Sequence, residues 1–190
     1  MDLKKLFSTI AALLFSFRAF WEEYFSGERS GNQWNVLKDY SAQLIAMVQL
    51  LKFPIIGVPR QAMIVAIATF LVDIAALYLI SGGMVRFVDT EGRRETEERV
   101  TALAGFSLTP VWLAEPFCFI DGWNWLFASL ALGYAFLICR SGFLLLAERY
   151  LQPAPSRPAM RNSALLFVTV CAALFLVERA ILRLFNGLPI

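Results

Sequence analysis

The apolar residues of this chain gather in five long runs separated by short polar segments. The runs cover residues 34–57, 62–87, 100–121, 123–146 and 163–185. An apolar run of about 20 residues is long enough to cross the hydrocarbon core of a bilayer as a helix. The pattern therefore predicts an all-α, polytopic membrane protein with five transmembrane helices, which form one domain over residues 34–190.

Residues 1–33 show a different pattern, typical of an amphipathic helix followed by a polar linker. Apolar side chains recur there at three- and four-residue spacing, and most charged side chains fall elsewhere. The apolar positions are Leu6, Phe7, Ile10, Leu13, Leu14, Phe17, Phe20 and Trp21. We predict that the helix lies in the membrane interface with this face in the bilayer. The alternative is that the inner part of the face packs against the other helices.

Composition agrees with a membrane protein and removes several function classes. Hydrophobic residues make up 58% of the chain and charged residues 17%, unlike an ordinary soluble domain. A net charge of +2 provides no basic field for nucleic acid. The chain has no histidine, which removes the usual general base and the commonest metal ligand. Its three cysteines, Cys118, Cys139 and Cys171, lie in separate runs without CxxC spacing and are expected to be apolar fillers.

The distribution of Lys and Arg predicts the orientation. One set of polar flanks carries most of these residues, whereas the other carries little beyond Arg60 and Arg183. Cytoplasmic flanks are enriched in Lys and Arg. We therefore expect a multi-pass protein of a bacterial inner (plasma) membrane, with a cytoplasmic amino terminus and an outside carboxyl terminus. The basic side is made of Lys4, Lys5, Arg18, Arg29, Lys38, Arg86, Arg93, Arg94, Arg99, Arg149, Arg157 and Arg161.

Several charged residues fall inside the apolar runs, where an unpaired charge is costly. At about 1.5 Å rise per helical residue, Asp73 is expected near the midplane and Arg140 in the inner half. The other charged residues, Lys52, Glu115, Glu178 and Arg179, are expected in the outer half. We predict that Glu115 pairs with Arg179 or Lys52, and Asp73 with Arg140. Such charges either line a polar cavity, lock helices together, or reach the interface from near the ends of the spans.

Pro110 interrupts the third apolar run. Proline lacks the backbone N–H and disfavours the helical conformation of the residue before it, here Thr109. We expect a kink or break at Leu108-Thr109-Pro110. The charged run at residues 89–99 is expected to form a solvated loop or a short helix.

Two segments carry a resemblance to a known family. LAGFSLTPVWLAEPFCFID, followed by GYAFLICRSGFLLLA, resembles the third and fourth spans of the Yip1 family at Thr109, Pro110, Tyr134 and Gly142. FSFRAFWEEYFSGE and YSAQLIAMVQLLKFPIIG resemble its amphipathic lead-in and first span. The usual lead-in proline is absent, with Arg18 near its place, and a long polar amino-terminal region is missing. The chain is therefore similar to the compact bacterial members, and the resemblance implies membrane organisation and partner binding.

The sequence thus favours a non-enzymatic membrane protein that binds partners or shapes the bilayer, or an accessory subunit of a larger membrane complex. Its expected partners are the bilayer and other membrane proteins or further copies of itself. A small transporter or channel that uses Asp73, Glu115 and Arg140 is the alternative. We expect no catalytic set, cofactor or metal site, because neither GxSxG nor paired metal ligands occur.

Overall fold

The computed structural model describes residues 3–27, 35–57, 59–88, 94–118, 122–151 and 155–186. These residues form helices joined by short connections and contain no β-strand, so the predicted all-α class is confirmed for them. The helices are α1 (Leu3–Ser26), a π-helical turn η1 (Leu37–Ser41), α2 (Ala42–Ile56), α3 (Pro59–Val88), α4 (Arg94–Ser107), α5 (Thr109–Cys118), α6 (Asn124–Tyr150) and α7 (Arg157–Asn186).

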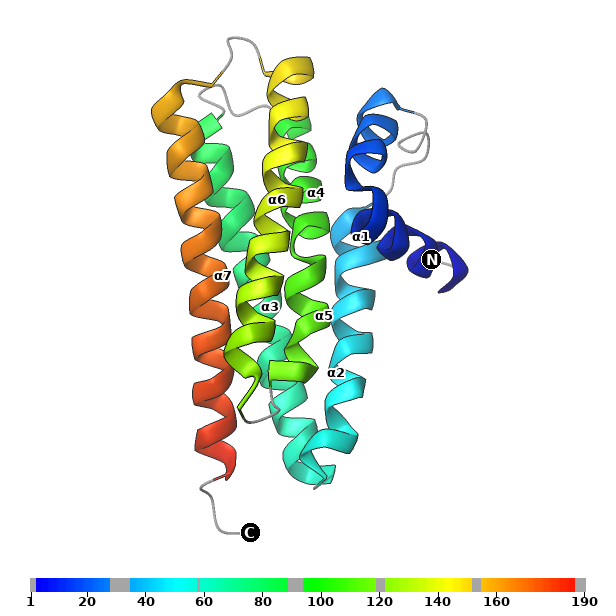
Figure 1. Ribbon diagram of the computed structural model, residues 1–190, viewed down its shortest axis with the longest axis vertical. Helices are drawn as coiled ribbons and strands as arrows, with labels where there is room; N and C mark the ends of the chain where they lie inside the picture. The colour runs from blue at the N-terminus through cyan, green and yellow to red at the C-terminus, as the bar shows by residue number, and fades with distance from the viewer. Residues whose placement is uncertain are drawn as a thin grey trace.

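The helices from α2 onward run along the long axis of the molecule, and successive columns alternate in direction (Figure 1). The turn η1 leads directly into α2, and α4 and α5 follow each other in one column. The helix α3 packs against α2, α4 and α7, while α6 packs against α1, α4, α5 and α7. The chain therefore forms an antiparallel bundle with α1 at its side.

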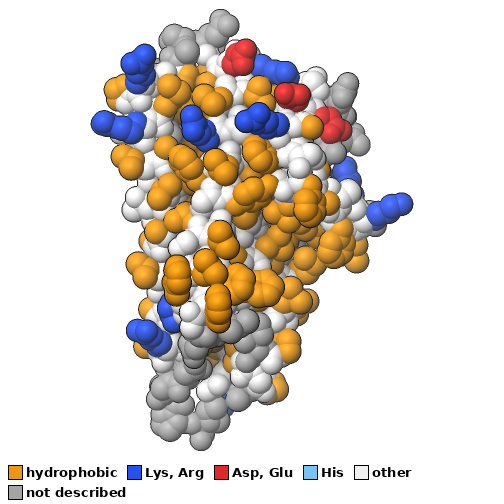
Figure 2. Space-filling model, viewed as in Figure 1, with side chains coloured by type: hydrophobic (Ala, Val, Ile, Leu, Met, Phe, Trp, Pro, Cys, Tyr) orange, Lys and Arg blue, Asp and Glu red, His pale blue; other side chains and the backbone are white. Residues whose placement is uncertain are grey.

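Within the described part of the chain, three helices are long and apolar enough to cross a membrane, namely α3, α6 and α7 over Arg157–Leu184. They correspond to the second, fourth and fifth predicted spans. The first and third predicted spans are divided in the structure, at the junction of η1 with α2 and of α4 with α5. Apolar side chains cover the middle of the face in Figure 2, and charged side chains gather mainly towards its upper end.

The break predicted beside Pro110 is present. Helix α4 ends at Ser107 and α5 begins at Thr109, because Pro110 has no N–H to donate to the preceding turn. Backbone hydrogen bonds continue on both sides, from the Leu108 N–H to the Ala104 carbonyl at 3.0 Å and from the Trp112 N–H to the Leu108 carbonyl at 3.1 Å. The two helices therefore stay in one column.

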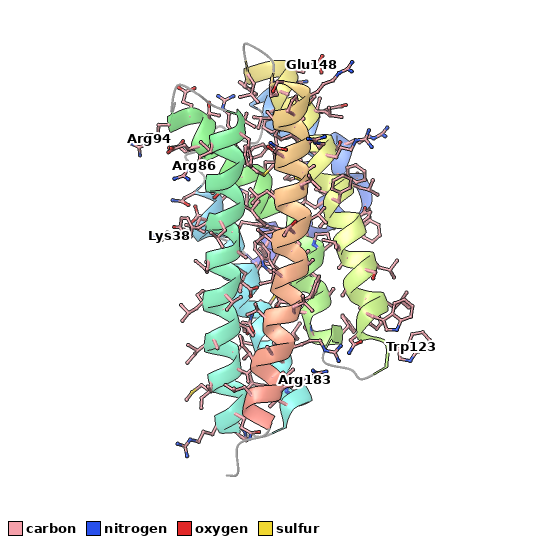
Figure 3. The ribbon with its side chains drawn as sticks, turned by 90° about the vertical axis from the view of Figure 1, so that its left-hand side faces the viewer. Lys38, Arg86, Arg94, Trp123, Glu148 and Arg183 are labelled. Carbon is pink, nitrogen blue, oxygen red and sulfur yellow. The ribbon has the colours of Figure 1, made fainter. Side chains whose placement is uncertain are left out.

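The polar connections agree with the predicted pattern where they are described. Residues 94–99 of the charged run form the first turns of α4, whereas residues 89–93 and Asp121 lie outside the described residues. Gly57 ends α2 with φ of 76°, a conformation that glycine adopts without strain. In Figure 3, Lys38, Arg86, Arg94 and Glu148 lie in the upper half, and Trp123 and Arg183 lie towards the lower end.

Candidate functional site

Four charged side chains from four different helices meet inside the bundle. Lys52 comes from α2, Asp73 from α3, Glu115 from α5 and Glu178 from α7. The first three residues are completely buried, and Glu178 is 2% exposed. With Gln49 and Thr69, they form what we call the buried cluster.

Lys52 is the only cation among these six side chains. Its Nζ lies 2.6 Å from Glu115 Oε2 and 3.6 Å from Glu178 Oε1, and it donates a hydrogen bond to Thr69 Oγ1 at 3.2 Å. The predicted pairing of Glu115 with Lys52 is therefore confirmed. Because the pair is fully buried, its short distance and added hydrogen bonds are what offset the cost of removing both charges from water.

Gln49 and Thr69 link the charged residues to one another. The Gln49 amide donates to Asp73 Oδ2 at 3.0 Å and to Glu115 Oε2 at 3.4 Å. The Thr69 hydroxyl donates to Gln49 Oε1 at 2.6 Å and also lies 2.9 Å from the Val65 carbonyl. The polar atoms of α2 and α3 thus form a connected network that reaches α5.

The buried cluster holds three carboxyl groups and one ammonium group. Carboxylate oxygens of Asp73, Glu115 and Glu178 all lie within 4.8 Å of one another. Two ionised carboxylates within that distance repel each other by at least about 3.5 kcal/mol at an effective dielectric constant of about 20. If all four groups are ionised, two negative charges remain, so stability requires further positive charge from protons or a cation.

The predicted pair of Asp73 with Arg140 is wrong, and of the two partners predicted for Glu115 the structure shows Lys52 rather than Arg179. Arg140 is exposed on α6, and Asp73 is bonded to Gln49 instead. Helix α3 starts at Pro59, earlier than the predicted span, and the adjoining ends of α2 and α3 lie lower than the end of α5 (Figure 1). Asp73 therefore lies at the height of Glu115, and counting from predicted span ends misplaced it. Arg179 is also exposed, so it is not the partner of Glu115.

Tyr134 and Gly142 hold α1 against α6. Tyr134 donates its hydroxyl to the Leu14 carbonyl, which α1 leaves available because the backbone departs from helical geometry at Ser16. A Cβ added at Gly142 would come within 2.5 Å of the Trp21 ring. The Trp21 indole N–H donates to the Ile138 carbonyl at 3.1 Å. The small residue at position 142 therefore provides room for the tryptophan.

An aromatic cluster extends this contact towards α4 and the π-helical turn. The Phe106 ring lies 4.9 Å from Tyr40 and 5.0 Å from Phe20, measured between ring centroids. Burial raises the pKa of Tyr24, in α1, to about 12, while the nearby Arg99 guanidinium acts in the opposite direction. The Tyr24 phenol therefore stays neutral at physiological pH and packs as an aromatic ring in this cluster.

The apolar face of α1 meets protein along most of its length. Leu6, Ile10, Leu13, Phe20 and Trp21 are buried, and Leu14 and Phe17 are half-buried. Of the eight predicted membrane-facing residues, Phe7 is exposed, at 55%. Packing on the bundle, the alternative reading of this face, is therefore what the structure shows.

Thr109 and Pro110 lie outside the buried cluster. The Thr109 hydroxyl is 2.7 Å from the Tyr40 hydroxyl, which ties the start of α5 to the π-helical turn. Sequence reasoning missed Gln49 and Thr69, although a signal existed. Gln49 precedes Lys52 by three residues and Thr69 precedes Asp73 by four, which places each pair on one helix face.

Comparison with known proteins gives no assignment for this arrangement: no family model, no curated protein and no solved structure matches the chain.

Proposed function

We propose that the chain is a non-enzymatic integral membrane protein that organises the bilayer around it and binds other membrane proteins. The observation that carries this proposal is the outer surface of α1. Leu3, Phe7 and Phe15 are 65%, 55% and 87% exposed on a helix whose other face is packed on the bundle. Such large apolar side chains need cover from lipid or protein.

The bilayer surface is the occupant that the neighbouring charges favour. Lys4, Lys5 and Arg18 belong to the same helix, and basic residues near an anionic leaflet contribute about 1 kcal/mol each. Helix α1 bends at Ser16, and its first part runs across the long axis of the bundle (Figure 1). A helix in this position lies along a membrane surface when the bundle stands upright in the membrane.

The bundle geometry is compatible with five crossings. The five residues of η1 and the fifteen of α2 make one column of about 30 Å, and α4 with α5 makes another. Helices α2 and α4 pack against α3, and α5 packs against α2 and α6. With Lys and Arg concentrated at one end, this favours a cytoplasmic amino terminus in a bacterial inner membrane. The Yip1 resemblance of the sequence points to the same kind of protein.

The outer surface of α1 can be tested with the double substitution Phe7→Ser and Phe15→Ser. Both side chains are exposed, so the bundle should stay folded. The full chain is reconstituted in vesicles that contain anionic phospholipid, and vesicle shape is followed by electron microscopy. Proteins recovered after cross-linking in native membranes are identified in parallel. The wild-type chain should change vesicle curvature and yield a reproducible partner, and the variant should lose the curvature effect.

Ser8→Ala, an exposed substitution on the same helix, serves as the matched control and should behave as wild type. The proposal fails if the wild-type chain neither alters the vesicles nor brings down a reproducible partner. If the double variant changes vesicle curvature as strongly as the wild type, the outer surface of α1 is not responsible for the effect.

A small transporter is a second candidate, because the buried cluster places three carboxyl groups together inside the bundle. Arg140 no longer belongs to this hypothesis, since it faces outward. Asp73→Asn and Glu115→Gln should then abolish proton or cation flux into vesicles while the fold is retained. If both substitutions only lower stability, the buried cluster is a lock between helices.

A further inference from the structure

The buried cluster contains carboxylate oxygens that have no hydrogen-bond partner. They are Asp73 Oδ1, Glu115 Oε1 and both oxygens of Glu178. All three residues are at least 98% buried. Buried acceptors without a partner are rare in folded proteins and call for an explanation such as a bound ion.

In Asp73 and Glu115, one carboxylate oxygen has a hydrogen-bond partner and the other has none. Gln49 donates to Asp73 Oδ2, and Lys52 and Gln49 both approach Glu115 Oε2. The opposite oxygen of each carboxyl group is the one left over. Lys52 and Gln49 therefore hold Asp73 and Glu115 in place without using the oxygens that a ligand needs.

The geometry of the three carboxyl groups suits a metal ion. They come from α3, α5 and α7, and one oxygen of each lies within 4.8 Å of the others. Two oxygen ligands on one cation at about 2.0–2.6 Å each are separated by no more than about 5 Å. Carboxylate oxygens without nitrogen or sulfur ligands favour hard cations such as Mg²⁺, Mn²⁺ and Ca²⁺.

The charge of the cluster indicates a divalent ion. Three carboxylates and the Lys52 ammonium sum to two negative charges, which one divalent cation neutralises. We propose that Asp73, Glu115 and Glu178 bind a hard divalent cation between α3, α5 and α7, each through one oxygen. The sequence predicts no metal site, because these three acids are far apart in the chain and do not form a local metal-binding motif.

This inference does not depend on the role of α1, and its test is separate. The purified full-length protein in detergent is treated with a chelator and then titrated with Mn²⁺, which is followed by electron paramagnetic resonance. Thermal unfolding is measured with and without Mg²⁺, Ca²⁺ and Mn²⁺. We expect one Mn²⁺ per chain and a higher melting temperature with the bound ion.

Glu178→Gln and Asp73→Asn remove one ligand charge each with little change in shape. Either variant should bind Mn²⁺ at least about tenfold more weakly, as changes near metal ligands commonly do. Glu148→Gln, an exposed site on α6, is the matched control and should bind as wild type. Circular dichroism checks that each variant is folded.

The wild-type titration decides the question even if a variant does not fold. Absence of Mn²⁺ binding to the folded wild-type chain, at millimolar concentration, overturns the proposal. So does equal binding by folded Glu178→Gln. The proposal is also overturned if acid raises the melting temperature of the wild type and none of the three cations does. Protons, not a metal ion, would then neutralise the buried cluster.

Discussion

The Lys52 side chain is completely buried and lies 2.6 Å from Glu115. Replacing it with methionine leaves the carboxyl groups without their cation, and breaking a buried pair in this way costs about 3–5 kcal/mol. Lys52→Met should therefore lower the free energy of unfolding by that amount, measured by denaturant titration in mixed micelles. Lys38→Met, the same change at an exposed position, should stay within about 0.5 kcal/mol of wild type. Equal losses in the two variants would show that the pair contributes nothing.

Gly142 offers a second test with a built-in comparison. An added Cβ would lie 2.5 Å from Trp21 Cε2 and 2.6 Å from Leu103 Cδ1, whereas at Gly133 nothing lies within 4 Å. Gly142→Ala should destabilise the chain by about 1–3 kcal/mol through overpacking. Gly133→Ala should stabilise it by up to about 1 kcal/mol, because alanine favours the helix. Thermal unfolding of the two variants in the same detergent compares them, and a gain at position 142 would contradict the tight contact with Trp21.

At the scale of residues, the sequence shows which buried charged residues need a partner more readily than it shows their height along the bundle. Charges within apolar runs marked Lys52, Glu115 and Asp73 as residues that need partners, and the Lys52–Glu115 pair follows from their similar height on α2 and α5, which run in the same direction. The network through Gln49 and Thr69 was missed because neutral polar residues are common in membrane helices. The place of Asp73 was misjudged because an error of a few residues in a span boundary displaces a side chain by about 5 Å.

At the scale of elements, α1 is fastened to α6 through its backbone. Tyr134 donates to the Leu14 carbonyl, and Tyr150 donates to the Phe25 carbonyl at 2.6 Å. These bonds lie on either side of the bend at Ser16. Together with the bond from the Trp21 indole N–H to the Ile138 carbonyl, they join α1 to α6 between Leu14 and Phe25, so α1 opens only when these bonds break and the aromatic packing yields.

The double substitution Tyr134→Phe and Tyr150→Phe tests this attachment. Each lost hydrogen bond contributes about 1 kcal/mol, so local opening of α1 should become about 30-fold more frequent. Amide hydrogen exchange over Leu3–Ser26, followed by mass spectrometry, measures that opening. Tyr78→Phe, an exposed position on α3, is the control and should leave α1 unchanged. Unchanged exchange in the double variant would mean that the Trp21–Ile138 bond and the aromatic packing hold α1 without the two tyrosine hydroxyls.

The periodicity of α1 identified its apolar face but could not identify what covers it. Lipid and the interior of a helix bundle are both apolar, so Leu13 and Trp21 satisfy either environment equally. The break in the third span was predictable because proline acts locally, through its own missing N–H. The π-helical turn at Leu37–Ser41 has no comparable local signal in the sequence.

At the scale of the molecule, the apolar runs predicted the all-α class and the order of the helices. Among the residues that the structure describes, three of the five runs form helices that meet the length and composition of a membrane span by themselves. The other two are divided, because hydropathy averages over a window and does not register a π-turn or a proline break. The divided columns are η1 with α2 and α4 with α5. Each of them crosses the bilayer if its two ends lie on opposite sides of the membrane.

Single cysteines introduced at exposed positions can determine those sides. In a chain that carries Cys118→Ala, Lys38→Cys and Arg94→Cys report on the end of the bundle where basic residues gather, and Trp123→Cys and Arg183→Cys report on the other end. If five columns cross the membrane, a membrane-impermeant maleimide should label positions 123 and 183 in intact cells and positions 38 and 94 only after permeabilisation. Cys139 and Cys171 are buried, so the parent chain should label weakly. Labelling of positions 94 and 123 from the same side would exclude a crossing by α4 and α5 and reduce the number of spans.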